Sequence, residues 1–202
     1  MSYKRWILVA IGLFGVGLAL GLIVPAGGVS FLSEDIVALG ELGDFLFSLP
    51  PALTAVVIFF KNASALLFSF ALSQIFCLAP IAALILNGWV LTMVSTMIIQ
   101  EESLGFVLAG LLPHGIIELP AFILGEAAAL SFGFMVILIM FKKREKSQLL
   151  PSLKQNSKYL AIAFALLVPA AIIETFVTPL LLDWDNKEDM ICRNWVWHPP
   201  FG

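Results

Sequence analysis

Charged residues are scarce in this sequence. Asp, Glu, Lys and Arg make up 12 % of its 202 residues, whereas soluble domains carry about 25 %. Eleven Lys and Arg stand against fourteen Asp and Glu, so the chain has no surplus of positive charge for a nucleic acid. With 60 % hydrophobic residues, it also has more apolar surface than a soluble domain of this size can bury. We therefore expect an integral membrane protein whose main partner is the lipid bilayer.

Histidine and cysteine are equally rare, with two of each. Cys77 lies in a hydrophobic run and Cys192 in the C-terminal part, so a disulfide between them is not expected. The sequence contains neither a zinc-binding H-E-x-x-H helix nor a G-x-S-x-G nucleophile elbow. The sequence therefore predicts no metal site, no cofactor and no catalytic residues, and catalysis is the weakest of the functions that we consider.

Long hydrophobic runs dominate the remaining sequence. About 20 apolar residues are needed to cross a bilayer. Four runs meet this criterion: residues 7–24, 63–100, 116–141 and 159–182. Residues 63–100 are 38 residues without a charge, which predicts two helices, and Asn87-Gly88 is a turn signal that would divide them. The fold class is therefore predicted to be an all-α transmembrane bundle of five full spans.

Two further segments are predicted to be only partly inserted in the membrane. Residues 45–60 are apolar but contain Pro50-Pro51, and residues 104–112 precede a stretch broken by Pro113, Gly115 and Pro120. Both are predicted to be interfacial or re-entrant pieces. Together with the five spans they form one membrane domain, residues 1–182, followed by an acidic and aromatic tail, residues 183–202.

Lys and Arg set the expected orientation, because cytoplasmic loops are enriched in these residues. With the N-terminus in the cytoplasm, eight of the eleven cations, including those of residues 142–158, lie inside. Only Lys61, Lys187 and Arg193 would then lie outside. The prediction is a multi-pass protein of the cell membrane with a cytoplasmic N-terminus, a cytoplasmic loop at residues 142–158 and an external C-terminus.

Three of the fourteen acidic residues lie inside predicted spans, where ionisable groups mark functional sites or internal hydrogen bonds. His114, Glu118, Ala121, Gly125, Ala129 and Gly133 follow one another at helical spacing and share one face. Small residues on such a face let a second helix approach closely. In the last span, Glu174 and Thr178 continue a face that carries Ala163, Leu167 and Ala171.

These faces predict a polar cluster inside the membrane. By the expected orientation, Asn62, His114, Glu118 and Glu174 lie at similar depth in three helices, with Thr178 beside them. Glu126 is deeper and off the main stripe, and Asn87 is a second, separate polar position. One interpretation is that these groups only satisfy one another and the broken backbone. The other is that water reaches them and they bind an ion or a polar solute.

The motif at residues 112–121, LPHGIIELPA, resembles the hallmark of the stage II sporulation protein M family. The segments at residues 58–63, 87–88 and 173–179 resemble further parts of the same family in the same order. The resemblance implies a polytopic membrane protein and draws attention to Asn62, His114, Glu118 and Glu174. The namesake of the family is the membrane partner of other proteins in a peptidoglycan-remodelling assembly, and members also occur in bacteria and archaea that do not sporulate.

Two functions remain open from the sequence. The first is a non-enzymatic membrane scaffold, as a homo-oligomer or together with other membrane proteins. Gly17-x-x-x-Gly21 in the first span offers a possible dimer face for this function. The second is a channel or transporter that uses the Glu, His and Asn cluster for a cation, a proton or a small polar solute.

Overall fold

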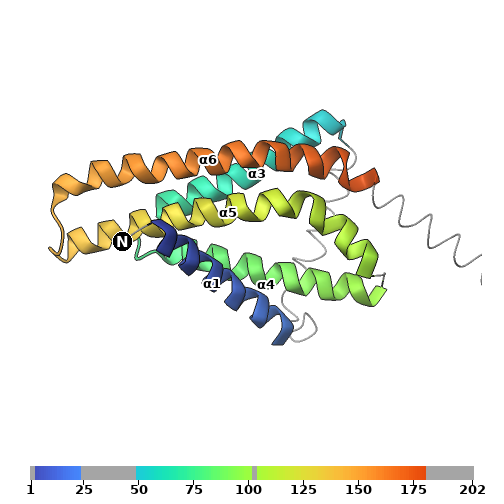
Figure 1. Ribbon diagram of the computed structural model, residues 1–202, viewed down its shortest axis with the longest axis horizontal. Coiled ribbons are helices and arrows are strands. Elements are labelled where there is room, and N and C mark those ends of the chain that lie inside the picture. The colour runs from blue at the N-terminus through green and yellow to red at the C-terminus, as the bar shows by residue number, and fades with distance from the viewer. Residues whose placement is uncertain (1–2, 24–48, 102–103, 181–202) are drawn as a thin grey trace, which may run out of the picture.

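The computed structural model describes residues 3–23, 49–101 and 104–180, and all regular elements in these ranges are helical. Five long helices are present there: α1 (Tyr3–Ile23), α3 (Pro51–Leu72), α4 (Leu78–Glu101), α5 (Leu104–Met140) and α6 (Leu149–Phe176), with the short 3-10 helix η3 (Lys146–Gln148) before α6 (Figure 1). Each of the five contains a stretch long and apolar enough to cross a membrane. The expected all-α architecture with five such helices is confirmed. The predicted tail, residues 183–202, lies outside the described residues.

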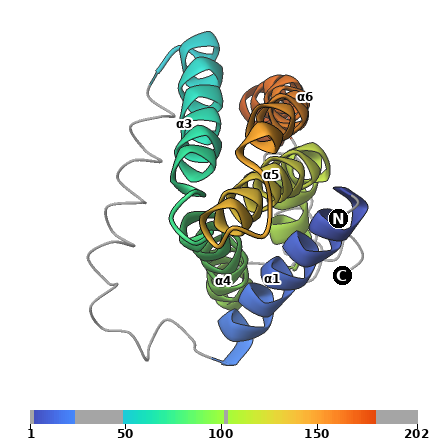
Figure 2. The same cartoon turned by 90° about the vertical axis from the view of Figure 1, so that its left-hand side faces the viewer.

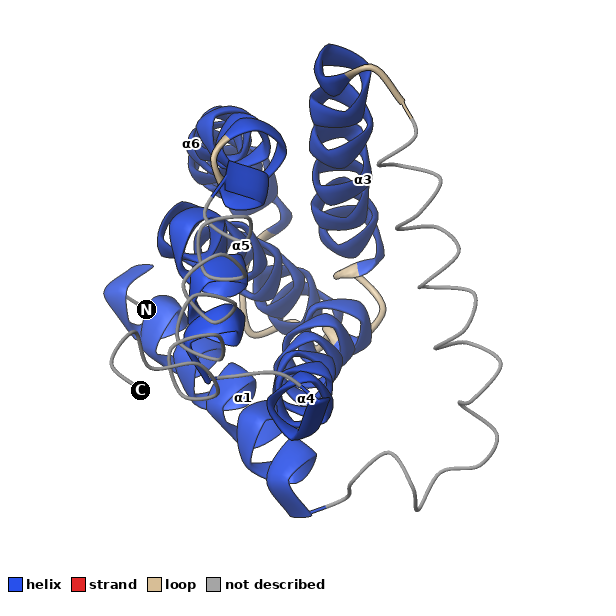
Figure 3. Cartoon of the chain, turned by 90° about the vertical axis from the view of Figure 1, so that its right-hand side faces the viewer, coloured by secondary structure: helices blue, strands red, loops and turns tan. Residues whose placement is uncertain are grey.

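Helix α5 lies at the centre of the bundle. Viewed from the end of the molecule, α3 and α6 lie on one side of it and α1 and α4 on the other (Figure 2). The opposite view shows the same division (Figure 3). A central helix of this kind is expected to be apolar around most of its circumference, which agrees with a sequence whose only ionisable residues are His114, Glu118 and Glu126.

Two cores form on opposite sides of α5. The first joins α5 to α3 and α6, and its buried members are Leu66, Phe70, Ala121, Ala128, Ala129, Phe132, Leu160, Ala163 and Leu167. The second joins α5 to α1 and α4, and its buried members are Trp6, Ala10, Phe14, Cys77, Leu84, Ala127 and Leu130. Consecutive alanines of α5 thus face different partners, because successive helix positions are turned by about 100°.

The expected stripe of small residues on α5 packs as predicted. Ala121 and Ala129 are fully buried. A methyl group added at Gly125 would meet the side chain of Leu66, and one added at Gly133 would meet the backbone carbonyl of Ser73. Small residues at these positions therefore allow α3 and the turn after it to lie directly against α5.

The turn between the second and third spans is not at Asn87-Gly88, and this prediction is wrong. Both residues lie inside α4, where Gly88 contacts the backbone of α1 at Phe14. The turn instead follows α3, where Phe76 and Cys77 have φ values of 51° and 57°. Residues 73–77 contain no Gly, Pro, Asn or Asp to favour a left-handed turn, and the nearest such residue is Pro80 in the first turn of α4.

The prediction of a broken segment at residues 45–60 is also wrong for its described part. Helix α3 begins at Pro51, with Pro50 as its N-cap, and continues to Leu72 without a break. Proline is tolerated in the first turn of a helix because the backbone N–H group it lacks would have no partner there. The Pro pair therefore starts a full span rather than interrupting one. Residues 45–48 lie outside the described part of the chain.

Residues 104–112 do not form a separate half-helix. They are the first turns of α5, which runs on through Pro113 and Pro120 and bends in this region toward α4 (Figure 1). Each proline removes one backbone hydrogen bond and pushes the preceding turn aside, which explains the bend. The apolar stretch long enough to cross a membrane starts at Gly115, after the first of these prolines.

The Gly17-x-x-x-Gly21 face is occupied within the chain. A methyl group added at Gly17 would meet the backbone of Ile85, and one added at Gly21 would meet Trp89 and Thr92. These glycines bring α1 against α4, so this face is not available for the dimer that the sequence suggested. The motif allows two helices to approach closely, as expected, but the second helix is α4 of the same chain rather than a helix of another copy.

Candidate functional site

Asn62 and Glu118 meet in the structure. The side-chain Nδ2 of Asn62 in α3 donates a 3.0 Å hydrogen bond to Oε1 of Glu118 in α5. The two residues are 56 positions apart in sequence, and both are partly buried. Two members of the polar cluster predicted from the sequence therefore come from different helices and are in direct contact.

This pair lines a cavity of about 230 Å³, which we call the central cavity. All five long helices contribute to its wall. Its lining residues are Phe14 of α1; Lys61, Asn62, Ala65 and Leu66 of α3; Asn87 and Leu91 of α4; Leu111, Gly115, Glu118, Leu119 and Phe122 of α5; and Leu167 of α6. An apolar wall with a few convergent polar groups is typical of small-molecule sites.

The part of α5 that carries Pro113 and Pro120 lines this cavity. Gly115 is buried and lines the central cavity, yet a methyl group added there would meet no atom within 4 Å. Pro120 cannot donate to the carbonyl four residues earlier, at Ile116, so one backbone acceptor of α5 loses its helical partner. Irregular backbone at membrane depth is tolerated where it is covered by protein or lines a cavity.

Lys61 is the functional candidate that the sequence reasoning missed. It was predicted to lie outside the membrane, but it lies halfway along α3 and lines the central cavity beside Asn62. A lysine in the middle of a helix long enough to span a bilayer is costly unless it reaches water or a polar partner. Its position next to Asn62, in an otherwise apolar run, was the available sequence signal.

Other predicted site residues lie elsewhere. Glu174 is half-buried in α6 but does not line the central cavity, and it makes no hydrogen bond to another residue of the described ranges. Thr178 is buried just after α6 and donates to the backbone carbonyl of Ile173 at 3.5 Å. His114 lies in α5 one turn before Glu118, and its side chain is outside the described part of the structure.

Asn87 and Glu126, the two secondary positions, have different surroundings. Asn87 lines the central cavity, and its Nδ2 donates to the carbonyl of Ala83 at 2.8 Å. Glu126 is only 1 % exposed, and Oε2 accepts a 2.5 Å hydrogen bond from the hydroxyl of Ser69 in α3. Glu126 therefore belongs to the contact between α3 and α5 rather than to the cavity.

The central cavity, which is partly open, thus combines one cationic side chain, one carboxyl group and two amides with an apolar wall, and its Lys61 and Asn87 are exposed. Carboxylate and amide oxygens accept hydrogen bonds or coordinate hard cations, and ammonium and amide N–H groups donate. Within residues 3–23, 49–101 and 104–180, no group of three or more His, Cys, Asp or Glu is arranged to hold a metal ion. The polar groups suit a small ion or polar molecule held by few contacts.

These features define a polytopic helical membrane protein with a polar cavity between its helices. Within this class, the chain belongs to the stage II sporulation protein M family, whose model matches residues 10–179. The resemblance carried by residues 112–121 is therefore confirmed.

Two relatives come from the archaeon Methanocaldococcus jannaschii. Uncharacterized protein MJ0793 is 28 % identical over 174 residues, which cover 86 % of this chain and 93 % of that protein. Uncharacterized protein MJ0706 is 38 % identical over 69 residues, which cover 33 % of this chain and 32 % of that protein. No solved structure matches the chain.

Proposed function

We propose that this protein is a membrane channel or transporter that holds a cation, a proton or a small polar solute in the central cavity. The observation that carries the proposal is the cavity itself, where Lys61, Asn62 and Glu118 face one space between five helices. Charged side chains within membrane helices are costly and mark ion or substrate pathways. Transporters place such sites beside broken or bent helices, as α5 is here.

The test is flux through the purified full chain in liposomes. We expect movement of protons, a monovalent cation or a small polar solute down an imposed gradient, measured with encapsulated indicator dyes or radiolabelled solutes. Glu118→Gln removes the charge but keeps an oxygen that accepts the hydrogen bond from Asn62, so the variant is expected to fold and to lose the flux.

Glu174→Gln is the matched control, since it neutralises a half-buried carboxyl group that does not line the cavity. It is expected to leave the flux unchanged. Equal loss of flux in both variants would contradict the assignment to the central cavity. Absence of any flux for protons, common cations, anions and small polar solutes would overturn the proposal.

A non-enzymatic membrane scaffold is the second candidate, and one observation favours it. The hydrogen bond between Asn62 and Glu118 links α3 to α5, and such a bond also stabilises helix packing without any transport. A scaffold predicts that Glu118→Leu lowers stability or assembly with partner membrane proteins, with no flux in the wild type. The liposome experiment therefore separates the two candidates.

A further inference from the structure

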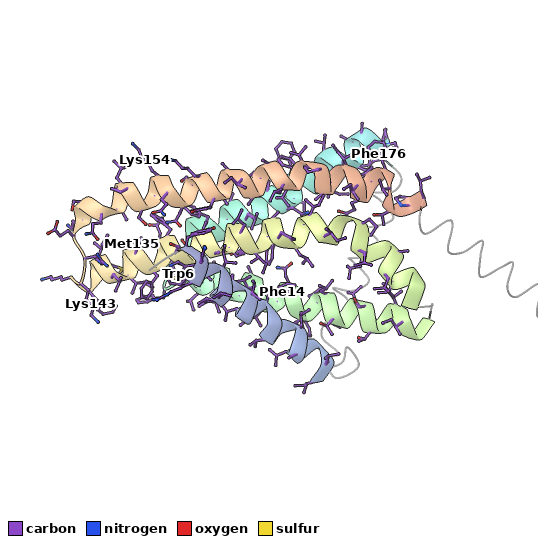
Figure 4. All side chains as sticks on the ribbon, viewed as in Figure 1. Trp6, Phe14, Met135, Lys143, Lys154 and Phe176 are labelled. Carbon is purple, nitrogen blue, oxygen red and sulfur yellow. The ribbon has the colours of Figure 1, made fainter. Side chains whose placement is uncertain are left out.

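A second cavity, separate from the central cavity, lies at the end of the bundle where α5 ends and α6 begins. This end is rich in Lys and Arg. The cavity measures about 300 Å³ and is bounded by α1, by the last turns of α5 and by the first turns of α6. We call it the loop-end cavity. It lies near the exposed turn that carries Lys142, Lys143 and Arg144, on the side predicted to be cytoplasmic. Figure 4 shows Trp6 and Met135, two of its lining residues, at the same end of the molecule as Lys143 and Lys154.

Asn156 supplies the most specific feature of this cavity. Asn156 is one of the residues that bound the cavity, and it is only 2 % exposed. Nδ2 donates to the backbone carbonyl of Ser152 at 2.9 Å and to the Ser152 hydroxyl at 3.3 Å. Because a carbonyl only accepts, these contacts fix which side of the amide is Nδ2. Oδ1 is then left as a buried acceptor without a donor in the described part of the chain.

A buried acceptor without a donor costs about 1–3 kcal/mol, so a ligand that donates an N–H or O–H group to it would gain affinity. Arg144 provides a positive charge at the same cavity. One of its nitrogens, Nη1, contacts Oε1 of Gln148 at 3.3 Å, and a guanidinium group has five donors in all. Arginine binds phosphate in this way through paired hydrogen bonds. A phosphate ester that also carries a hydroxyl group would satisfy both Arg144 and Asn156.

The surroundings favour a lipid as the source of that phosphate ester. Tyr3 and Trp6 line the cavity where α1 begins, and Phe134, Met135 and Leu138 form its apolar wall near the end of α5. Trp and Tyr are enriched at the level of lipid headgroups. Basic clusters beside membrane helices on the cytoplasmic side attract anionic lipids. A headgroup in the cavity would thus place its acyl chains against the apolar flank of the bundle.

We propose that the loop-end cavity binds the headgroup of an anionic phospholipid, with the phosphate at Arg144 and a headgroup hydroxyl donating to Oδ1 of Asn156. This site is independent of the proposed transport function. It accounts for three observations together: the orphaned amide oxygen, the cation at the rim and the aromatic and apolar wall.

The experiment measures lipid binding to the purified full chain in an uncharged detergent by native mass spectrometry. The probes are phosphatidylglycerol, which has the phosphate and hydroxyl groups, and phosphatidylethanol, which has the same charge but no headgroup hydroxyl. Phosphatidylcholine is the zwitterionic control. We expect phosphatidylglycerol to bind most tightly, phosphatidylethanol more weakly and phosphatidylcholine most weakly.

Three variants assign the contacts. Arg144→Gln should lower the binding affinity for both anionic lipids by about tenfold. This is the fold-change expected when a hydrogen bond to a charged group is lost. Lys143→Gln removes the same charge at a neighbouring residue that does not line the cavity, and should change binding by no more than about threefold. Asn156→Leu should abolish the preference for phosphatidylglycerol over phosphatidylethanol.

Equal losses in Arg144→Gln and Lys143→Gln would overturn the proposal, because they would indicate diffuse attraction to the basic turn. A preference for the hydroxylated lipid that persists in Asn156→Leu would also overturn it. Displacement of phosphatidylglycerol by equimolar soluble glycerol phosphate would identify a free phosphate ester instead of a lipid. Arg144 is exposed, so its variant tests the phosphate contact even if Asn156→Leu does not fold.

Discussion

The hydroxyl of Ser69 in α3 donates a 2.5 Å hydrogen bond to the carboxyl group of Glu126 in α5. Glu126 is 1 % exposed and Ser69 is 6 % exposed, so neither group has water as an alternative partner. The bond lies close to Gly125, against which the side chain of Leu66 in α3 packs. A polar pair in this position fixes the register of α3 against α5, because any shift along the axis would leave the buried carboxyl without its donor.

Ser69→Ala is therefore expected to destabilise the protein. Loss of the donor leaves the buried carboxyl of Glu126 without this hydrogen bond, which costs about 1–3 kcal/mol. The free energy of unfolding, measured by denaturant titration of the purified protein in detergent, checks this value. Ser64→Ala is the control, since Ser64 is an exposed residue of the same helix and bonds only to the carbonyl of Lys61 within the described residues. A loss as small as that of the control would contradict the role given to the pair.

Gly17→Ala is expected to loosen the contact between α1 and α4. The added methyl group would meet the backbone carbonyl of Ile85, which cannot move aside as a side chain can. Overpacking of this kind costs about 1–3 kcal/mol. The midpoint of thermal unfolding in detergent should fall accordingly.

Gly12→Ala is the matched control in the same helix. A methyl group at Gly12 would meet no atom within 4 Å, and alanine favours helix over glycine by about 0.5–1 kcal/mol. The unfolding midpoint should therefore stay the same or rise. Equal destabilisation by both substitutions would show that the packing of Gly17 is not the cause.

Gly115→Leu is expected to fill part of the central cavity. Gly115 is buried and lines the cavity, and a Cβ added there would meet no atom within 4 Å. The protein should therefore remain folded, and under the proposed transport function its flux should be lower than that of the wild type. Flux in liposomes, together with the elution profile and the circular dichroism spectrum, checks both parts of this expectation.

Gly115→Ala adds a single methyl group and is expected to leave flux nearly unchanged, which separates loss of volume from a change in backbone freedom. Undiminished flux in a folded Gly115→Leu variant would show that solute does not pass through this part of the cavity.

The sequence predicted which face of α5 packs against other helices, but not where the polar groups of α6 lie. Helical spacing on α5 predicted the stripe of small residues, because a period of 3.6 residues is a local property of the chain. It also predicted that Glu118 lies on the packing side of the helix. It did not predict that Glu174 would stay away from the central cavity, since the rotation of α6 against α5 is not encoded in the sequence of α6 alone.

Two predictions about helix boundaries were wrong because both relied on local turn signals in the sequence. Asn87-Gly88 and Pro50-Pro51 are strong turn signals in soluble proteins, yet here the first pair lies within α4, where Gly88 is a packing position, and the second starts α3. Phe76 and Cys77 form the actual left-handed turn without any residue that favours it. In each case a tertiary contact or a helix boundary decided the outcome against the local propensity.

The sequence by itself determined that this chain is a helical membrane protein, because a chain with 60 % hydrophobic and 12 % charged residues cannot hide its apolar surface in water. It also determined the number of long apolar helices within the described residues and the family motif at residues 112–121. Only the tertiary structure decided that Lys61, Asn62 and Glu118 share one cavity while Glu126 bonds to Ser69. The physical reason is that side-chain partners depend on how five helices are rotated and displaced against one another, and this arrangement follows from packing across the whole bundle.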